Sequence, residues 1–359
     1  IRDSTKPFII RNCSIHNMGT GGEYDGAIKL NNTKNGIITK NNCSRNNASG
    51  IVLYRSHNNT VEKNNLFDND VHRNDLNGAL RGLYVFQSHN NTITWNNASD
   101  NYYGIRVYNS EDNTISHNNV SKNDNAGIYC LIGRSNNIRN NFLSENEYYG
   151  ITLSGIKDSK VFNNTIKENR TGIQILGGSE NVTISKNNIT TVLSSGTRGI
   201  ILDSSRENFV ISNEIYDNEV GIRLYYSTND TKIISNNIYD CDGFGIEIIH
   251  NLGEEACYDS IIYNNTFNNP GATNAHDNGT NTRWYYGKLG NSWSDYTGED
   301  KNDDGIGDTP YVINPSGAKD RYPIYRDADD QPPIISILSP SSDTIFTKED
   351  TPPDFKVSI

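Results

Sequence analysis

The chain is poor in hydrophobic residues, in sulfur and in basic charge. Only 34% of its 359 residues are hydrophobic, one is Met and five are Cys, and 32 Lys and Arg stand against 43 Asp and Glu, for a net charge of −11. The sequence has no stripe of basic residues that could neutralise phosphates, so we exclude nucleic acid as a partner. No apolar run approaches a membrane span, and the sequence opens at Ile1 inside a repeat, so we expect any signal peptide to precede this fragment.

The chain does contain a repeat. Ten glycines recur at intervals of 22 to 32 residues: Gly26, Gly50, Gly82, Gly104, Gly127, Gly150, Gly172, Gly199, Gly221 and Gly245. Each unit holds three short alternations of apolar and polar residues, each long enough for a strand and too short for a helix. The period predicts an all-β fold, a right-handed single-stranded parallel β-helix of about eleven coils over residues 1–269.

Two inward ladders are expected to bury the core, because equivalent residues in neighbouring strands lie about 4.8 Å apart. The first ladder is Leu53, Val85, Val107, Cys130, Leu153, Ile175, Leu202, Leu224 and Ile248. The second is Cys43, Leu66, Ala98, Val120, Leu143, Ile166, Ile189, Ile215 and Ile238. An Asn pair such as Asn118-Asn119 precedes the second ladder. Asn tolerates left-handed geometry and can bond along a stack, so we assign these pairs to turns.

The five cysteines fall into two groups, and the sequons would fit a secreted protein. Cys13, Cys43 and Cys130 fall on ladder positions and are interpreted as core residues. Cys241 and Cys257 lie off the ladders, and whether they form a disulfide stays open. Asn-x-Ser/Thr triplets recur in the Asn-rich repeat, so a secreted glycoprotein would fit, although whether the sequons are glycosylated also stays open.

The period ends near residue 269, and residues 270–330 are rich in Trp, Tyr and Asp, as expected for an irregular C-terminal cap. Within it, oxygen ligands follow the first half of a calcium loop: Asp300, Asn302, Asp304, the Ile306 carbonyl and Asp308. Position 12 is Tyr311 instead of the bidentate Glu of an EF-hand. We therefore predict a structural calcium site, with a plain Asp/Gly turn as the alternative.

The closing segment resembles that of NosD-like β-helix proteins. The resemblance rests on Gly290 to Tyr296, Asp303 to Tyr311 and Asp320 to Pro323, and it covers most of residues 8–325. It implies carbohydrate-binding or sugar-hydrolase type repeats in a surface protein of methanogenic archaea. NosD itself is linked to copper delivery, but one Met and dispersed His residues give no soft-ligand pattern here. Residues 331–359 resemble the linker and truncated start of an immunoglobulin-like or PKD module.

Function on a β-helix is expected on outward residues and inserted loops. The stretches Met18–Asp25 and Asp68–Arg81 are predicted to form two walls. The face between and beside them carries outward residues that we predict to bind carbohydrate: Tyr54, Tyr84, Phe86, Arg106, Tyr108 and Tyr129. Aromatic faces suit sugar rings. The alternatives are that the second wall packs over these rings, or that the rings form an oligomer interface.

Two function classes stay open. The first is an extracellular or cell-surface protein that binds polysaccharide or envelope glycan. The second is a polysaccharide hydrolase or lyase, for which disaggregatase-like matrix enzymes are the nearest analogy. Acid-base candidates lie on the walls: Asp25, Asp70, His72 and Asp75. The Gly-His-Gly, Arg-Ile-Lys and Asn-Thr-Asp patterns of familiar β-helix enzymes are absent from the sequence.

Overall fold

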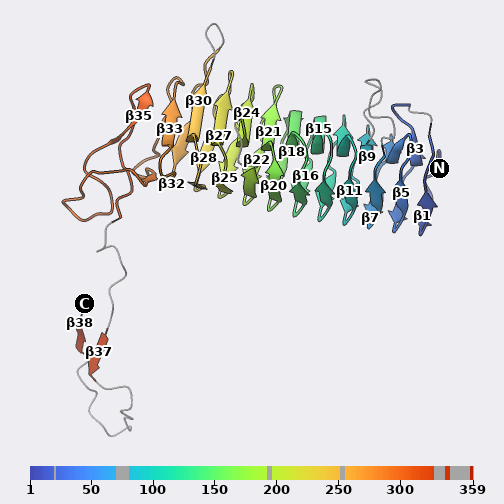
Figure 1. Ribbon diagram of the computed structural model, residues 1–359, viewed down its shortest axis with the longest axis horizontal. Helices are drawn as coiled ribbons and strands as arrows, with labels where there is room; N and C mark the ends of the chain where they lie inside the picture. Colours follow the sequence, from blue (N-terminus) through green and yellow to red (C-terminus); the bar gives the residue numbers. More distant parts are fainter. Residues whose placement is uncertain are drawn as a thin grey trace.

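The chain winds into a rod built from three long sheets, with one strand per coil in each sheet (Figure 1). The computed structural model describes residues 1–19, 22–69, 81–191, 196–250 and 255–326, and the backbone of residues 336–339 and 356–358. The expected all-β parallel solenoid of about eleven coils is confirmed. The described residues include no helix long and apolar enough to cross a membrane.

We number the three sheets in chain order within a coil: the strand that holds the recurring Gly belongs to sheet 1, the next strand to sheet 2 and the third to sheet 3. Sheet 1 contains β3 (Gly26–Asn31), β6 (Ser49–Tyr54), β9 (Arg81–Phe86), β12 (Tyr103–Tyr108), β15 (Ala126–Arg134), β18 (Tyr149–Lys157), β21 (Thr171–Leu176), β24 (Arg198–Asp203), β27 (Val220–Tyr225), β30 (Phe244–Ile249), β33 (Thr273–Asp277), β35 (Tyr311–Pro315) and β36 (Ala318–Asp320). Sheet 2 contains β1 (Phe8–Arg11), β4 (Gly36–Thr39), β7 (Thr60–Glu62), β10 (Thr92–Thr94), β13 (Thr114–Ser116), β16 (Asn137–Arg139), β19 (Lys160–Phe162), β22 (Thr183–Ser185), β25 (Phe209–Ile211), β28 (Lys232–Ile234) and β31 (Ile261–Tyr263). Sheet 3 contains β2 (Ser14–Ile15), β5 (Asn42–Ser44), β8 (Asn65–Phe67), β11 (Asn97–Ser99), β14 (Asn119–Ser121), β17 (Phe142–Ser144), β20 (Thr165–Asn169), β23 (Asn188–Thr191), β26 (Glu214–Tyr216), β29 (Asn237–Tyr239), β32 (Thr266–Asn268) and β34 (Ser292–Trp293).

Both inward ladders are confirmed. Neighbouring strands pair in parallel and in register, so that Val107 lies between Val85 and Cys130. Every member of the two ladders has at most 1% of its surface exposed. Because each coil adds the same few apolar side chains to one continuous core, a low overall hydrophobic content is enough.

The recurring glycine is required by close packing inside the coil. A Cβ atom on Gly104 would lie 2.3 Å from Cγ1 of Val120 and 2.7 Å from the carbonyl oxygen of Gly127. Here, at the start of the sheet 1 strand, the backbone packs directly against a core side chain of sheet 3, and no space is left for a side chain. Glycine therefore recurs once in each coil, at this position.

The first Asn of each pair points inward and forms a continuous amide ladder. The backbone N–H and Nδ2 of Asn96 both donate to Oδ1 of Asn118, at 2.9 and 3.0 Å, and Asn118 repeats this with Asn141. The ladder runs through Asn41, Asn64, Asn96, Asn118, Asn141, Asn164, Asn187, Asn213, Asn236, Asn265 and Asn291. The stacked amides confirm the expected bonding along the turns. The left-handed residue, however, is the one before the pair, as at His117 with φ 55°.

The amide ladder ends in the C-terminal segment. Asp320 is fully buried, and its Oδ2 accepts the N–H of Asn291 at 2.7 Å and Nε1–H of Trp293 at 3.0 Å. Burial raises the pKa of this carboxyl, although these hydrogen bonds oppose the rise. Strands β33 and β35 extend sheet 1 and β34 extends sheet 3, so part of the segment at residues 270–330 continues the sheets of the rod.

All five cysteines are free thiols, so the disulfide left open for Cys241 and Cys257 does not form. Cys241 follows β29 at the corner between sheets 3 and 1, whereas Cys257 precedes β31 at the corner between sheets 1 and 2. Cys43 and Cys130 are buried in the core as expected, and Cys13 is partly exposed. Strands β37 (Ser336–Ser339) and β38 (Lys356–Ser358) pair antiparallel, and the module assigned to this end stays a prediction.

Candidate functional site

The aromatic face on sheet 1 is partly buried. Tyr84 has no exposed surface and Phe86 has 9%, so the prediction of an open row of rings is wrong for these two residues. Tyr24, from the stretch before β3, lies over them with ring centroids 6.1 Å from Tyr84 and 4.9 Å from Phe86. Tyr24 also contacts Tyr54 edge-on at 5.3 Å. The inner part of the face is therefore packing between coils.

The outer part of the face is centred on Arg106. Its guanidinium lies 5.3 Å from the ring of Tyr103, 5.7 Å from Tyr108 and 5.6 Å from Tyr129, and these side chains are all partly exposed. Such distances are in the range of cation–π attraction. Among the described residues Arg106 forms no ion pair, and its buried Nε has no hydrogen-bond partner there.

A second arginine lies beside this group but is inaccessible. Arg81 is 2% exposed, with its guanidinium 4.3 Å from the ring of Tyr84, and it donates to the Glu23 carbonyl at 3.0 Å. Burial first, and then the neighbouring charge of Arg106, lower the pKa of Arg81 to about 10. Burial also raises the pKa of Tyr84. These two buried side chains pack within the face and are not accessible to a ligand.

Of the four catalytic candidates, Asp25 alone lies among the described residues. Asp70, His72 and Asp75 lie outside the described residues, as does most of the second wall. Asp25 stands directly before β3, where its carbonyl accepts the N–H of Ser49 at 3.0 Å. Its role as an acid or base remains a prediction.

The predicted calcium ligands all lie in one largely exposed loop between β34 and β35: Asp300, Asn302, Asp304, Ile306 and Asp308. Asp300 accepts the N–H of Gly305 at 2.7 Å, and Asp304 accepts the N–H of Ile306 at 3.0 Å. These hydrogen bonds hold the two carboxylates against the backbone of their own loop. No group of three His, Cys, Asp or Glu among the described residues is arranged to hold a metal, and calcium binding stays a prediction.

Calcium should raise the melting temperature if the ion binds only the folded loop. Saturation about 100-fold above the dissociation constant would add about 2.7 kcal/mol to the free energy of unfolding. We expect melting in EDTA to occur at lower temperature than in excess Ca²⁺, and Asp304→Ala to remove the difference. Glu299→Ala, which changes an exposed neighbour outside the proposed ligand set, is the control. Equal melting of the parent chain in both conditions would leave a plain turn.

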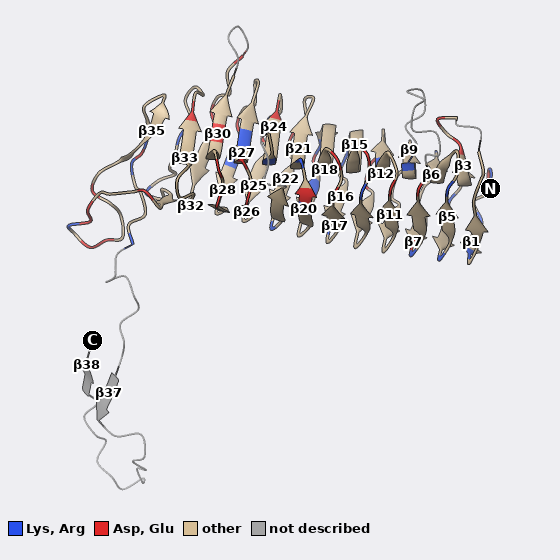
Figure 2. Cartoon of the chain, in the orientation of Figure 1, with Lys and Arg blue, Asp and Glu red and all other residues tan. Residues whose placement is uncertain are grey.

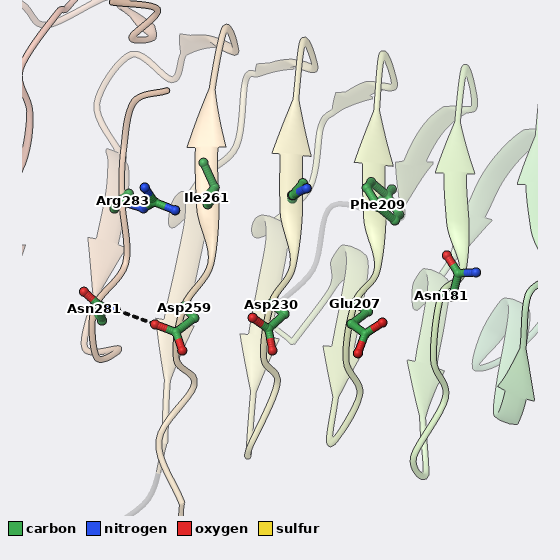
Figure 3. A pocket seen from close by; sticks show the side chains of 9 residues that line it. Asn181, Glu207, Phe209, Asp230, Asp259, Ile261, Asn281 and Arg283 are labelled. Carbon is green, nitrogen blue, oxygen red and sulfur yellow. Dashed lines mark hydrogen bonds between the residues drawn. The ribbon is translucent and has the colours of Figure 1, made fainter. Parts of the chain in front are cut away.

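A groove that the sequence analysis did not single out runs along the rod near β25, β28 and β31, with a volume of ≈ 780 Å³ (Figure 3). One row of side chains occupies the left-handed corner between sheets 1 and 2: Asn181, Glu207, Asp230, Asp259 and Asn281. A second row stands two residues later in each coil: Phe209, Lys232, Ile261 and Arg283. We call this the axial groove.

The two rows of the axial groove carry opposite charges that do not pair. Neither Lys232 nor Arg283 forms an ion pair among the described residues, although each coil places a carboxylate or an amide two positions earlier. Lys232 instead holds its ammonium 5.5 Å from the ring of Phe209. Asp259 accepts a hydrogen bond from Nδ2 of Asn281. Figure 2 shows that charged residues are otherwise scattered among mostly uncharged strands.

A signal for the axial groove was present in the sequence. The segments Glu207–Phe209, Asp230–Lys232 and Asp259–Ile261 begin at equivalent positions of three successive coils. Aligning the coils on their corners, rather than on their glycines, would have placed these carboxylates in one row.

Comparisons with known proteins agree with the fold. Residues 3–146, 67–191 and 190–298 match the family model described as periplasmic copper-binding protein (NosD). The A-module of the mannuronan C-5 epimerase AlgE6 of Azotobacter vinelandii shares 14% identity, with 82% of this chain and 90% of that one covered and a TM-score of 0.51. DFA-IIIase from Arthrobacter chlorophenolicus A6 shares 13% identity, with 73% and 70% covered and a TM-score of 0.50. The Dettilon tailspike protein shares 14% identity, with 76% and 61% covered and a TM-score of 0.50. At these identities the solved structures show the fold alone, and no curated protein matches.

The described residues do not fit a copper site. Copper in proteins favours clustered His, Cys and Met ligands. Met18 is exposed, and four of the five thiols are buried. His57 and His89 stack with ring centroids 5.0 Å apart, but Nδ1 of His57 accepts the backbone N–H of His89 and Nδ1 of His89 that of Glu111. These histidines hold a turn.

Proposed function

The chain belongs to the NosD family, and on that premise we propose that it acts outside the cytoplasm, at the cell surface or in the surrounding matrix, as a rod that binds acidic polysaccharide. The family's description as periplasmic and the recurring Asn-x-Ser/Thr sequons support this location. The observation that carries the proposed activity is the axial groove, whose two rows offer opposite charges and a ring along several coils (Figure 3).

Each row suits a different edge of a polysaccharide lying along the rod. Lys232 and Arg283 would pair with uronate carboxylates, and Phe209 would pack against the apolar face of a sugar ring. The carboxylates of Glu207 and Asp230 would accept hydroxyl hydrogen bonds. Because equivalent positions repeat about every 4.8 Å along the axis, a linear chain lying in the groove can contact successive coils, with cations on alternate coils at Lys232 and Arg283.

The net charge of −11 does not prevent binding of an anionic chain. Exposed charges are screened beyond about 8 Å at physiological ionic strength, so the nearest cations dominate the local field. Salt should weaken the interaction for the same reason. The exposed residues around Arg106 would provide a second contact for an anionic sugar, with Tyr54, Tyr108 and Tyr129 as the ring platform.

Removing the ring and the ammonium together should weaken binding strongly. We expect Phe209→Ala with Lys232→Ala to lower the affinity for polygalacturonate by about 1 to 3 kcal/mol, through lost stacking area and one lost charge, while the melting temperature stays within about 2 °C. Isothermal titration at two salt concentrations measures this. Lys160→Ala is the matched control, since Lys160 is an exposed outward residue of sheet 2 outside the groove lining. Equal affinities of the double variant and the control would refute the groove as the binding site.

A polysaccharide hydrolase is the second candidate, favoured by the stacking of Glu207, Asp230 and Asp259 in one row. Coils one and two apart place such carboxylates on the order of 5 to 10 Å apart, the range of glycosidase acid-base pairs. Reducing ends that accumulate in the binding mixtures and disappear with Glu207→Gln or Asp230→Asn would support the hydrolase. Binding without product supports the binding protein.

A further inference from the structure

An exposed tryptophan stands on a different corner of the rod. Trp95 lies between β10 and β11 with 58% of its surface exposed, whereas the other two tryptophans, Trp284 and Trp293, are at most 5% exposed. Phe142, the first residue of β17, is 43% exposed. Exposed large rings are unusual on a surface that is otherwise polar, and they mark contact sites when they gather.

The turn does not need a ring at this position. Trp95 has φ 58°, a left-handed conformation that a bulky residue adopts at a cost of about 1 to 3 kcal/mol. The same corner is made by Lys63 in the preceding coil and by Asn140 two coils later, with similar φ values. The structure of the corner therefore gives no reason for a Trp, and a role for the exposed ring is the simpler explanation.

Trp95 belongs to a small groove of ≈ 370 Å³ with an uncharged lining. The lining residues are Trp95, Asn96, Asn97, His117, Asn118, Asn119, Asn140 and Phe142. Trp95 and His117 stack with centroids 4.6 Å apart and an angle of 17° between their planes. We call Trp95, His117 and Phe142 the aromatic shelf. The lining of this small groove is uncharged, whereas the lining of the axial groove includes Asp, Glu, Lys and Arg.

The amides beside the shelf leave hydrogen-bonding atoms for a ligand. An outer ladder runs from Asn65 to Asn97 to Asn119, with each Nδ2 of the later residue donating to the earlier Oδ1 at 2.9 to 3.3 Å. Phe142 occupies the next rung, so within the described residues no donor reaches Oδ1 of Asn119. Nδ2 of Asn140 lies 3.2 Å from Nε2 of His117, so Nδ1 of this ring is the nitrogen that faces away from Asn140 and can bond to a ligand.

We propose that the aromatic shelf is a second carbohydrate site, which binds an uncharged pyranose unit of a polysaccharide. The apolar face of the sugar packs on the exposed rings, and its hydroxyl or acetamido groups bond to Asn119 and His117. The inference rests on the proposed function for the class of ligand, a carbohydrate. It differs in the residues that bind and in the sugar, which is uncharged at the shelf and acidic in the axial groove. A protein partner fits less well, because specific interfaces bury about 1,200 to 2,000 Å² and this groove spans only three coils.

Trp95 reports on this site directly, because the other two tryptophans are buried. Titration of the full chain with cellotriose and with chitotriose should shift the tryptophan emission to shorter wavelength and protect it from acrylamide quenching. We expect Phe142→Ala and Asn119→Ala each to weaken the response about five- to tenfold. Tyr258→Ala, which removes an exposed ring elsewhere on the rod, should leave it unchanged.

The outcomes separate the two sites. The shelf proposal predicts that Phe209→Ala with Lys232→Ala keeps the Trp95 response to neutral sugars, while Trp95→Ala keeps the binding of polygalacturonate. Unchanged Trp95 emission and quenching with both neutral sugars would overturn the shelf while leaving the axial groove standing. An emission shift that depends on protein concentration alone, with a dimer in sedimentation, would identify the shelf as an interface between copies and also overturn it.

Discussion

Val107→Asp is expected to abolish cooperative folding. Val107 is 1% exposed and lies in the first inward ladder between Val85 and Cys130, with no polar partner in the dry stack. An isolated carboxylate buried there would cost several kcal/mol or force the group to stay protonated. Domain stabilities amount to about 5–15 kcal/mol, so the loss is a large share of the total. Circular dichroism during heating measures the effect.

Asn109→Asp is the matched control. It lies two residues further along, is exposed, and has φ 48°, a conformation that Asp tolerates. It adds the same charge outside the core and should melt within about 1 °C of the parent chain, since exposed substitutions usually change stability by less than 0.5 kcal/mol. A Val107→Asp variant that melts like this control would contradict the assignment of the inward face.

The second large effect is expected for Asn118→Ala. Oδ1 of Asn118 accepts both the backbone N–H and Nδ2 of Asn96, and its Nδ2 donates to the Ile93 carbonyl at 3.0 Å and to Asn141 at 3.0 Å. Alanine would leave several of these buried groups without a partner, each at a cost of about 1–3 kcal/mol. We expect a loss of about 3–6 kcal/mol in the free energy of unfolding, measured by denaturant titration.

The adjacent Asn119→Ala provides the comparison. Asn119 is exposed, and its single side-chain hydrogen bond to Asn97 is 3.3 Å long, so we expect a loss of less than about 1 kcal/mol. Two neighbouring identical residues would then differ several-fold in their contribution. Equal losses for the two substitutions would show that the amide ladder does not stabilise the turns.

The sequence predicted the solenoid because its physical cause is local and periodic. A strand placed every 22 to 32 residues can bury its apolar side chains only by stacking, so Leu53, Val107 and Ile175 could be assigned inward from spacing alone. The Asn pairs were assigned to turns correctly, but the left-handed residue was placed one position too late. In the structure Asn118 is a buried amide, and the preceding His117 makes the turn.

The candidate sites were harder to predict because they depend on side chains from different coils. Nothing near β9 in the sequence shows that Tyr24 covers Tyr84 and Phe86. The sequence analysis did not single out Trp95, because its exposure depends on how the corners of successive coils stack. The axial groove was missed because its members lie off the glycine positions that define the repeat.

A crystal structure of the chain with a bound acidic oligosaccharide tests the central claim most directly. Our account predicts sugar density along the axial groove, with uronate carboxylates near Lys232 and Arg283, a ring on Phe209, and hydroxyls toward Glu207 and Asp230 (Figure 3). Soaks with the Phe209→Ala, Lys232→Ala variant should lack this density. Sugar bound only elsewhere on the rod, or the same density in the variant, would contradict the account.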